Sequence, residues 1–227
     1  MSWADGLREA EVEPSLYAAD FARLGEQIEQ LLAAGTRVFH YDVGDGHFVE
    51  PIIMGPIVLQ SIGGLIHGGG GSVDVHLMIE SPERHFRAFR EAGADSVTFH
   101  YEAVEDVAAI ATAAREHGLG VGVALKPKTP VEEVAEAAIV AGADLVLCMS
   151  IEPGYSGQKF MPEAIERLGR LRELLPEAIQ LQVDGGVNHD NTHAAREAGA
   201  NLLVAATAVF GEGDPAAGYR GLVEALG

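Results

Sequence analysis

Cysteine and lysine are scarce in this sequence of 227 residues, which contains one cysteine, Cys148, and three lysines. A single cysteine excludes an internal disulfide framework and is compatible with a reducing compartment. The 15 basic residues are outnumbered by 34 acidic residues, which gives a formal net charge of −19. Because this charge repels polyanions, we expect neither nucleic acid nor an anionic membrane as a partner.

Long apolar segments are also missing. No run of 18 or more apolar residues occurs, so we predict no transmembrane helix. The first residues, MSWADGLREAEVEP, lack the apolar core of a secretory signal, and the expected location is the cytoplasm. Hydrophobic residues nevertheless make up 48% of the chain, enough for the core of one large domain.

A pattern recurs along the chain, in which a helical stretch is followed by a small-residue break and an apolar run. The breaks contain glycines at positions 35, 93, 118, 142 and 199, with gaps of 58, 25, 24 and 57 residues. The pattern indicates a helix, a C-terminal glycine, a short loop and a strand. Repeated alternation of strand and helix predicts a parallel sheet with right-handed crossovers.

The repeat predicts eight strands, at residues 11–17, 37–43, 73–79, 95–100, 119–125, 144–149, 179–184 and 201–206. Eight such units in a chain of this length predict an α/β fold with a single (β/α)8 TIM barrel over residues 1–227. An open doubly wound sheet is the alternative, but no G-x-G-x-x-G follows the first strand. Residues 1–10 are expected to be a loosely ordered N-terminal segment, and the segment GGLIHGGGGS, residues 63–72, a flexible loop.

Polar residues interrupt the apolar runs at alternate positions. Successive side chains of a strand point to opposite faces, so His40 and Asp42 share one face of the second strand. The same alternation puts His76 and Asp184 on the polar faces of the third and seventh strands. Barrel active sites lie at the C-terminal ends of the strands. Buried imidazoles and carboxylates are costly unless compensated, and two of each suit one divalent metal such as Zn, Fe, Mn or Co.

Other polar residues near these strand ends are weaker candidates for a functional site. Asp45 and His47 follow the second strand and are expected in its loop. His100 and Glu102 share the polar face of the fourth strand. They either line the barrel interior or form a polar pair.

The loops after the last three strands indicate an anion site. Their sequences are EPGYSGQKF, DGGVN and ATAVF. Glycine lets backbone N–H groups approach a phosphate closely, and the loops after barrel strands seven and eight often form such a site. Together the loops predict a phosphorylated ligand.

The segments PSLYAADFARLG, HYDVGDGHFV, VDVHLM, TFHYEA, MSIEPGYSGQKF and VDGGVN resemble the ribulose-phosphate 3-epimerase family, from about residue 13 to residue 210. The resemblance implies a metal held by His40, Asp42, His76 and Asp184, with Asp42 and Asp184 as the acid/base pair. It also implies substrate contacts from Ser15, His76, Gly154, Tyr155, Ser156, Gly157, Gly185, Gly186, Ala206 and Thr207.

The implied reaction inverts carbon 3 of D-ribulose 5-phosphate to give D-xylulose 5-phosphate, through an enediolate. It requires one divalent metal and no organic cofactor. The resemblance also implies assembly into a homo-oligomer.

Several positions depart from the usual pattern of the family. Gly44 stands where the family commonly has methionine, and Glu50-Pro51 where it has Pro-Asn. The other departures are Glu152 for asparagine, Ser156 for glycine, and Ala206-Thr207 for Gly-Ser. Because of these changes the substrate could be another ketose phosphate, such as D-allulose 6-phosphate. An aldolase using Lys126, or a phosphosugar-binding barrel without turnover, are the remaining alternatives.

Overall fold

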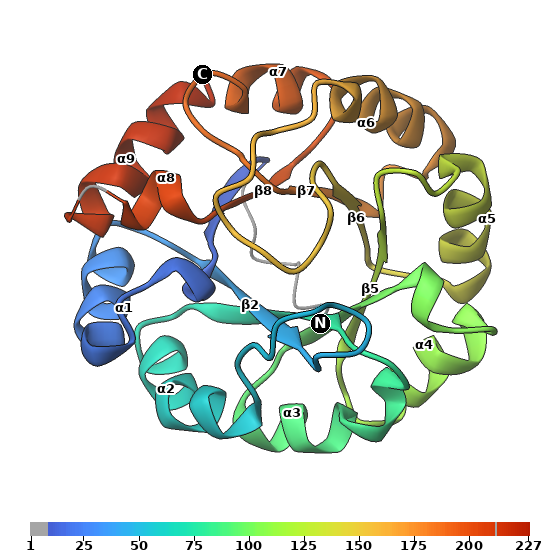
Figure 1. The fold of residues 1–227 in the computed structure, drawn as a ribbon, viewed down its shortest axis with the longest axis horizontal. Coiled ribbons are helices and arrows are strands. Elements are labelled where there is room, and N and C mark those ends of the chain that lie inside the picture. The colour runs from blue at the N-terminus through green and yellow to red at the C-terminus, as the bar shows by residue number, and fades with distance from the viewer. Residues whose placement is uncertain (1–8, 212) are drawn as a thin grey trace.

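The computed structural model describes residues 9–211 and 213–227, which form a barrel of parallel strands surrounded by helices (Figure 1). The expected (β/α)8 barrel is confirmed. Its strands are β1 (Glu11–Pro14), β2 (Val38–Gly44), β3 (Ser72–Met78), β4 (Ser96–His100), β5 (Gly120–Leu125), β6 (Leu145–Met149), β7 (Gln180–Asp184) and β8 (Leu202–Ala205).

Helices connect the strands and form the outer ring. They are α1 (Leu24–Ala33), α2 (Pro56–Gly68), α3 (Phe86–Ala92), α4 (Val107–Glu116), α5 (Val131–Ala141), α6 (Glu163–Leu174), α7 (Thr192–Glu197), α8 (Thr207–Phe210) and α9 (Pro215–Ala225). Short 3-10 helices are η2 (Leu16–Ala18), η3 (Phe21–Arg23), η4 (Pro82–Arg84) and η5 (Tyr101–Ala103). In the described part of the chain, none of the helices is long and apolar enough to cross a membrane.

The sheet closes between its first two strands. The hydrogen-bonded order runs β1-β8-β7-β6-β5-β4-β3-β2. A parallel bridge between Ser15 and His40 joins the remaining edges. Strand β1 is shorter than expected because the chain turns into η2 at Leu16. This turn leaves Ser15 at the end of β1, next to β2.

Glycines end helices where the sequence repeat predicts them. Gly93 follows α3 with a φ of 111°, and Gly142 follows α5 with a φ of 59°. These left-handed conformations carry no penalty for glycine, and the chain can reverse directly into the next strand.

The predicted flexible loop at residues 63–72 is wrong over most of its length. Helix α2 continues to Gly68, so only residues 69–71 connect it to β3. Buried Leu59, Ile62 and Ile66 hold the helix against the sheet. Gly63 allows close packing, since a Cβ there would lie 2.8 Å from the carbonyl oxygen of Ala92. The prediction for residues 1–10 falls mainly on residues 1–8, outside the described residues.

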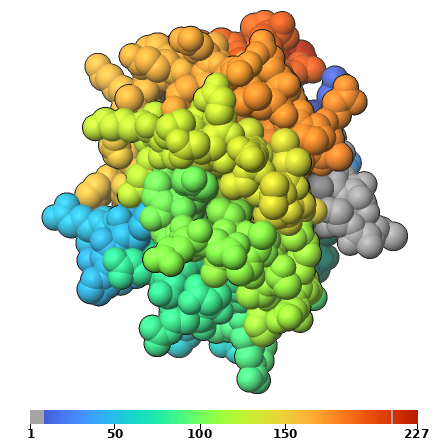
Figure 2. All heavy atoms as spheres, turned by 90° about the vertical axis from the view of Figure 1, so that its right-hand side faces the viewer, coloured from blue at the N-terminus to red at the C-terminus, as the bar shows by residue number. Residues whose placement is uncertain are grey.

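Apolar residues form the core on the outer side of the barrel, between the strands and the helices. Phe39, Tyr41 and Val43 of β2 belong to this layer, as the strand alternation predicts. Figure 2 shows the side of the molecule covered by α4 and α5, where side chains form a continuous surface. A smaller apolar cluster on the inner side consists of Ala124, Leu147, Met149 and Ile151. Much of the remaining barrel interior is polar.

Candidate metal centre and substrate pocket

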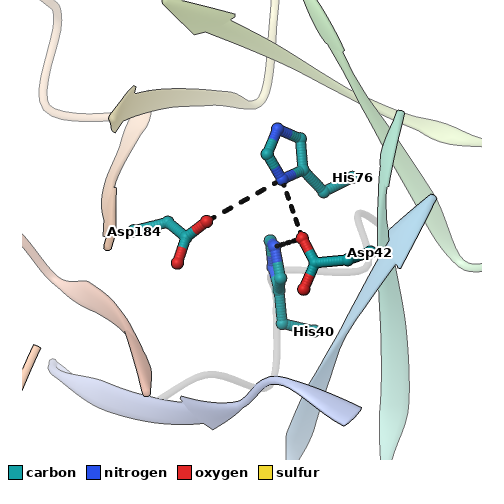
Figure 3. Close-up of side chains that lie close together, drawn as sticks. All are labelled: His40, Asp42, His76 and Asp184. Carbon is teal, nitrogen blue, oxygen red and sulfur yellow. Dashed lines mark hydrogen bonds and ion pairs between the residues drawn. The ribbon is translucent and has the colours of Figure 1, made fainter. Parts of the chain in front are cut away.

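Four side chains from three strands meet at the C-terminal end of the barrel (Figure 3). They are His40 and Asp42 of β2, His76 of β3 and Asp184 of β7, and each offers one ligand atom within 4.8 Å of the others. Asp42 Oδ1 lies 3.3 Å from His40 Nε2 and 3.1 Å from His76 Nδ1. Asp184 Oδ2 lies 3.9 Å from His76 Nδ1. The convergence expected from the sequence is therefore present.

Strand register explains this convergence. Asp42 pairs with His76 across β2 and β3, so the two side chains stand at one level. The bridge at the barrel seam brings Ser15 beside β2. Its hydroxyl donates a hydrogen bond of 2.6 Å to Asp42 Oδ2. One oxygen of Asp42 is thus held by Ser15 while the other faces the histidines.

The donor set suits a divalent cation. Both ring nitrogens of His40 lack a hydrogen-bond partner in the described residues, although this side chain is completely buried. Unpaired buried nitrogens are costly unless a further group binds them. Two imidazoles and two carboxylates are ligands that divalent transition metals accept. The residues present therefore fit one such ion.

The two carboxylates of the centre differ in their proton affinity. Burial opposes ionisation of Asp42, but the neighbouring charges of His40 and His76, with the hydrogen bond at His76 Nδ1, hold its pKa well below the usual range. Burial raises the pKa of Asp184, and repulsion by Asp42 adds to this effect. Burial also opposes a charged His40, yet Asp42 keeps the pKa of this imidazole well above its usual value. The environment thus keeps Asp42 ionised and makes Asp184, whose pKa is raised to about 6, the carboxyl group that takes up a proton more readily.

A second polar layer lies beneath the metal centre. His40 Nδ1 is 3.6 Å from Asp74 Oδ2 and 3.8 Å from Glu13 Oε2. Gln182 donates to both carboxylates from its amide nitrogen. Ser96 donates a further hydrogen bond of 2.7 Å to Asp74. Burial, followed by repulsion from Asp74, raises the pKa of Glu13 to about 8.

His100 and Glu102 form a polar pair, which is one of the two arrangements expected from the sequence. His100 Nδ1 lies 3.2 Å from Glu102 Oε2. The opposite nitrogen, His100 Nε2, lies 2.9 Å from His76 Nε2. Burial lowers the pKa of His100 to about 4. Burial opposes ionisation of Glu102, but hydrogen bonds from His100 and Thr129 lower its pKa to about 2.

A pocket of about 510 Å³, open to solvent, lies above the metal centre. It includes nine of the ten residues expected to contact substrate, namely Ser15, Gly154, Tyr155, Ser156, Gly157, Gly185, Gly186, Ala206 and Thr207, together with Asp42 and Asp184. The tenth, His76, is completely buried and does not line the pocket. Its position suits a metal ligand rather than a substrate contact.

The loop between β2 and α2 forms one wall of this region. Asp45 organises the loop, since its Oδ1 accepts hydrogen bonds from the N–H groups of His47 and Phe48. Gly44 leaves room for the loop to fold back, because a Cβ there would lie 2.8 Å from the carbonyl oxygen of Pro51. Asp45 and His47 are therefore loop residues, as expected, and serve the structure of the loop rather than the cation.

The same wall is joined to the β6–α6 loop. The Tyr155 hydroxyl donates a hydrogen bond of 3.1 Å to Glu50 Oε2. A Cβ on Gly154 would lie 3.2 Å from Cβ of Val49, so these loops pack closely. Glu50 is one of the positions that depart from the family pattern, and its hydrogen bond to Tyr155 connects two loops beside the pocket.

Sequence reasoning missed part of the pocket. Tyr17, Ile151, Val187 and Val204 also line it. The alternation of side chains along β8 identifies Val204 as inward-facing. The other three lie in loops or a short helix, where no sequence period indicates direction.

Comparison with known proteins identifies the family. Residues 11–210 match the sequence pattern of the ribulose-phosphate 3 epimerase family. This chain belongs to the ribulose-phosphate 3-epimerase family. The ribulose-phosphate 3-epimerase of Schizosaccharomyces pombe is 41% identical over 214 residues, covering 94% of this chain and 92% of that protein. The Bacillus subtilis enzyme of the same name is 39% identical over 207 residues, covering 89% of this chain and 93% of its own.

The resemblance found in the sequence is thus confirmed. The chain is an isomerase that acts on carbohydrate phosphates, and more specifically a ketose-phosphate epimerase.

Solved structures of lower identity support the fold. KGPDC from Streptococcus mutans has a TM-score of 0.72 at 12% identity and covers 96% of this chain and 98% of its own. The 3-hexulose-6-phosphate synthase from Salmonella typhimurium has a TM-score of 0.72 at 19% identity and covers 95% and 98%. At these identities the likeness concerns the barrel alone.

Proposed function

We propose that this epimerase inverts carbon 3 of a ketose phosphate by proton transfer between Asp42 and Asp184, with D-ribulose 5-phosphate and D-xylulose 5-phosphate as its substrate pair. The observation that carries the proposal is the position of these carboxylates. They come from β2 and β7, line one pocket, and have pKa values displaced in opposite directions.

Inversion at carbon 3 needs a base on one side of the substrate and an acid on the other. The proton on this carbon is acidic because the carbon is adjacent to the carbonyl group. Its removal gives an enediolate with negative charge on oxygen. Asp42, held ionised by its histidine neighbours, acts as the base in one direction while Asp184 returns a proton to the opposite face. The two exchange roles in the reverse direction.

The chain's remaining groups orient these carboxylates. Ser15 holds one oxygen of Asp42 while His40 and His76 face the other, and together these contacts fix the carboxylate at the pocket. Met78, Met149 and Ile151 supply apolar surface in the same pocket. Such surface excludes water from the reacting carbon and protects a reactive enediolate from side reactions.

The residues that would hold the metal are His40, Asp42, His76 and Asp184. When bound, a divalent cation such as Zn, Fe, Mn or Co supplies Lewis-acid stabilisation of the negative charge that develops on substrate oxygen.

Backbone amides are the proposed phosphate ligands. The described residues that line the pocket include neither arginine nor lysine. The backbone N–H groups that we propose instead are those of pocket-lining residues, namely Gly154 to Gly157, Gly185 with Gly186, and Ala206 with Thr207. Backbone N–H groups act over short distances, so phosphate binding by them is compatible with the negative net charge of the chain.

Lys126 is poorly placed for an aldolase. Its Nζ lies 3.9 Å from the centre of the Phe48 ring, and the residue does not line the pocket. Imine chemistry at this lysine therefore has no support.

The experiment that tests the proposal follows deuterium at carbon 3 in heavy water. Metal-loaded protein is offered five- and six-carbon ketose phosphates, including D-allulose 6-phosphate. We expect deuterium in the epimerised product, with the ribulose 5-phosphate pair turned over fastest. Faster turnover of a six-carbon substrate would reassign the substrate. Binding without exchange on any ketose phosphate would contradict catalysis.

Two matched variants separate the carboxylates. In D184N, with Asp42 intact, one epimer should exchange its carbon 3 proton without inversion, and in D42N only the other epimer should do so. Inversion should fall by about 100-fold or more in both. Metal content is measured alongside, because both residues are proposed ligands. Unchanged inversion in D184N with metal bound would disprove the two-carboxylate mechanism.

We also propose that the chain assembles with copies of itself. Phe21, Ile52 and Ile57 are large apolar residues with exposures of 53%, 87% and 79%. They lie in η3, the β2–α2 loop and the first turn of α2. Exposed apolar groups of this kind favour association. Light scattering should give a mass above that of one chain, and I52E/I57E should reduce it; a monomeric wild type would contradict the proposal.

A further inference from the structure

His76 has different partners on its two ring nitrogens. Nδ1 faces Asp42 and Asp184 in the metal centre, at 3.1 Å and 3.9 Å. Nε2 faces away from that centre, toward His100 Nε2 at 2.9 Å. Only one of two facing imidazole nitrogens can donate the proton of such a hydrogen bond, and the other must accept it. The direction of this bond decides which nitrogen of His76 carries a proton.

Glu102 fixes the direction from the far end. Its Oε2 faces His100 Nδ1 at 3.2 Å. An ionised carboxylate only accepts hydrogen bonds, so His100 must carry its proton on Nδ1. A neutral His100 then presents a lone pair at Nε2. His76 must therefore donate from Nε2, so the proton that its Nδ1 shares with Asp42, 3.1 Å away, is the one that a bound cation replaces.

The carboxylate itself is held in place. Glu102 Oε1 accepts hydrogen bonds from the backbone N–H of Lys126, at 2.8 Å, and from the Thr129 hydroxyl. The His100 ring also packs on Phe48, with 4.8 Å between ring centres. Neither group is free to turn, so the chain Glu102–His100–His76 has one preferred proton arrangement.

We propose that Glu102, acting through His100, is a positioning residue that keeps the proton of His76 on Nε2 and thereby leaves Nδ1 to bind the catalytic cation. The inference rests on the proposed metal role of His76. It adds a function for two residues that do not line the substrate pocket. A carboxylate behind a ligand histidine orients the ring and strengthens it as a ligand, and here a second imidazole transmits the effect.

Glu102→Gln is designed to reverse the arrangement without changing the shape of the side chain. The Lys126 N–H can only donate, so the amide oxygen of glutamine takes the position of Oε1. The NH₂ group then faces His100 Nδ1 as a donor. His100 must accept there and carry its proton on Nε2, which forces His76 to accept at Nε2 and to hold its proton on Nδ1. A cation can then bind Nδ1 only by displacing the one proton of the ring, which has no alternative position on Nε2.

Two readouts test this arrangement. Nitrogen-15 NMR of histidine-labelled, metal-free protein reports which ring nitrogen of His100 and His76 carries a proton. Competition with a chelator reports the affinity for Zn²⁺. We expect Nδ1–H on His100 in wild type and Nε2–H in E102Q, with zinc binding weakened about 10- to 100-fold in the variant.

Matched variants exclude a general loss of structure. Thr129→Val removes one hydrogen bond to Glu102 Oε1 but keeps the one from the Lys126 N–H and leaves a carboxylate facing His100, so it should keep the wild-type proton positions and zinc affinity. His100→Phe retains a ring against Phe48 but ends the chain, and should weaken zinc binding as E102Q does. Melting temperatures check that each variant is folded.

The possible failures are distinguishable. Wild-type proton positions and zinc affinity in folded E102Q would overturn the inference and leave the proposed function standing. A wild-type protein that binds no zinc, iron, manganese or cobalt would instead overturn the metal role on which both rest. Equal weakening of zinc binding by T129V and E102Q would also overturn the inference, since the loss would then come from altered packing around Glu102 and not from the position of the histidine protons.

Discussion

At the scale of single residues, Glu13 is a carboxyl group enclosed in the barrel. It is completely buried, and its pKa is raised to about 8 by burial and by Asp74. Between its ordinary value of 4.5 and about 8, the folded protein keeps a proton that the unfolded chain has lost. The folded state therefore binds more protons in this range, and stability falls as pH rises.

Glu13→Gln should remove this dependence. One such group changes the free energy of unfolding by about 1.4 kcal/mol per pH unit. We expect metal-free E13Q to gain stability over wild type between pH 5 and 8, with the difference growing as pH rises. Urea unfolding at these two pH values measures it. Exposed Glu116→Gln is the control, and an equal pH slope in E13Q and wild type would refute the assignment.

Protons should also compete with the cation. The pKa of His40 is raised well above its usual value and that of Asp184 to about 6, so at pH 6 bound metal must displace the proton of His40 and part of a proton from Asp184. Affinity should therefore increase with pH, by about tenfold per unit for each proton displaced. Chelator competition at pH 6 and pH 8, with titration calorimetry in two buffers to count released protons, measures this. Equal affinity at both pH values, with no proton release, would contradict it.

Much of the centre is predictable at this scale. A period of two in each strand is enough to turn His40, Asp42, His76 and Asp184 inward, and the barrel brings their strand ends together. The partners of His76 are less predictable. The hydrogen bond between His76 and His100 depends on ring rotation, which strand alternation does not specify.

At the scale of elements, the β6–α6 and β7–α7 loops touch at Gly186. This residue has a φ of 63°, and a Cβ on it would lie 2.4 Å from the backbone nitrogen of Phe160. Gly186→Ala should therefore displace the loop that contributes proposed phosphate ligands. A displacement of about 1 Å can lower kcat/KM by up to about 100-fold.

Steady-state kinetics should show this loss chiefly as a raised KM. Gly169→Ala is the matched control, because nothing lies within 4 Å of a Cβ added there in α6. That variant should keep wild-type kinetics. A wild-type KM in G186A would contradict a role for this loop in the phosphate site.

The contact between Tyr155 and Glu50 joins two loops beside the pocket. Tyr155→Phe removes one hydrogen bond, worth about 1 kcal/mol at most sites. We expect KM to rise by a few-fold, with kcat nearly unchanged. Tyr101→Phe, whose hydroxyl faces Glu133 instead, is the control. A KM equal to wild type in Y155F would show that the contact does not shape the pocket.

Elements were predictable where a repeat marks them. Glycines after helices indicated the positions of the strands, and all eight occur. The repeat failed at residues 63–68, where glycine was interpreted as loop although it lies in α2. Glycine at position 63 lets α2 pack against the backbone of Ala92, and local sequence does not reveal this contact. The contact between Tyr155 and Glu50 also joins residues that are far apart in the sequence, so local sequence does not predict it.

At the scale of the whole molecule, closure of the barrel creates the site. Asp184 of β7 reaches His76 of β3 only because the sheet curves into a ring, with Ser15 and His40 bridging its seam. An open sheet of the same strands would separate them.

The most direct test of the account is anomalous X-ray scattering from crystals grown with Zn²⁺. We expect one zinc peak per chain at the barrel mouth, about 2.0–2.2 Å from His40, Asp42, His76 and Asp184, with His76 bound through Nδ1. A crystal with zinc bound elsewhere, and these four side chains free of it, would contradict the account.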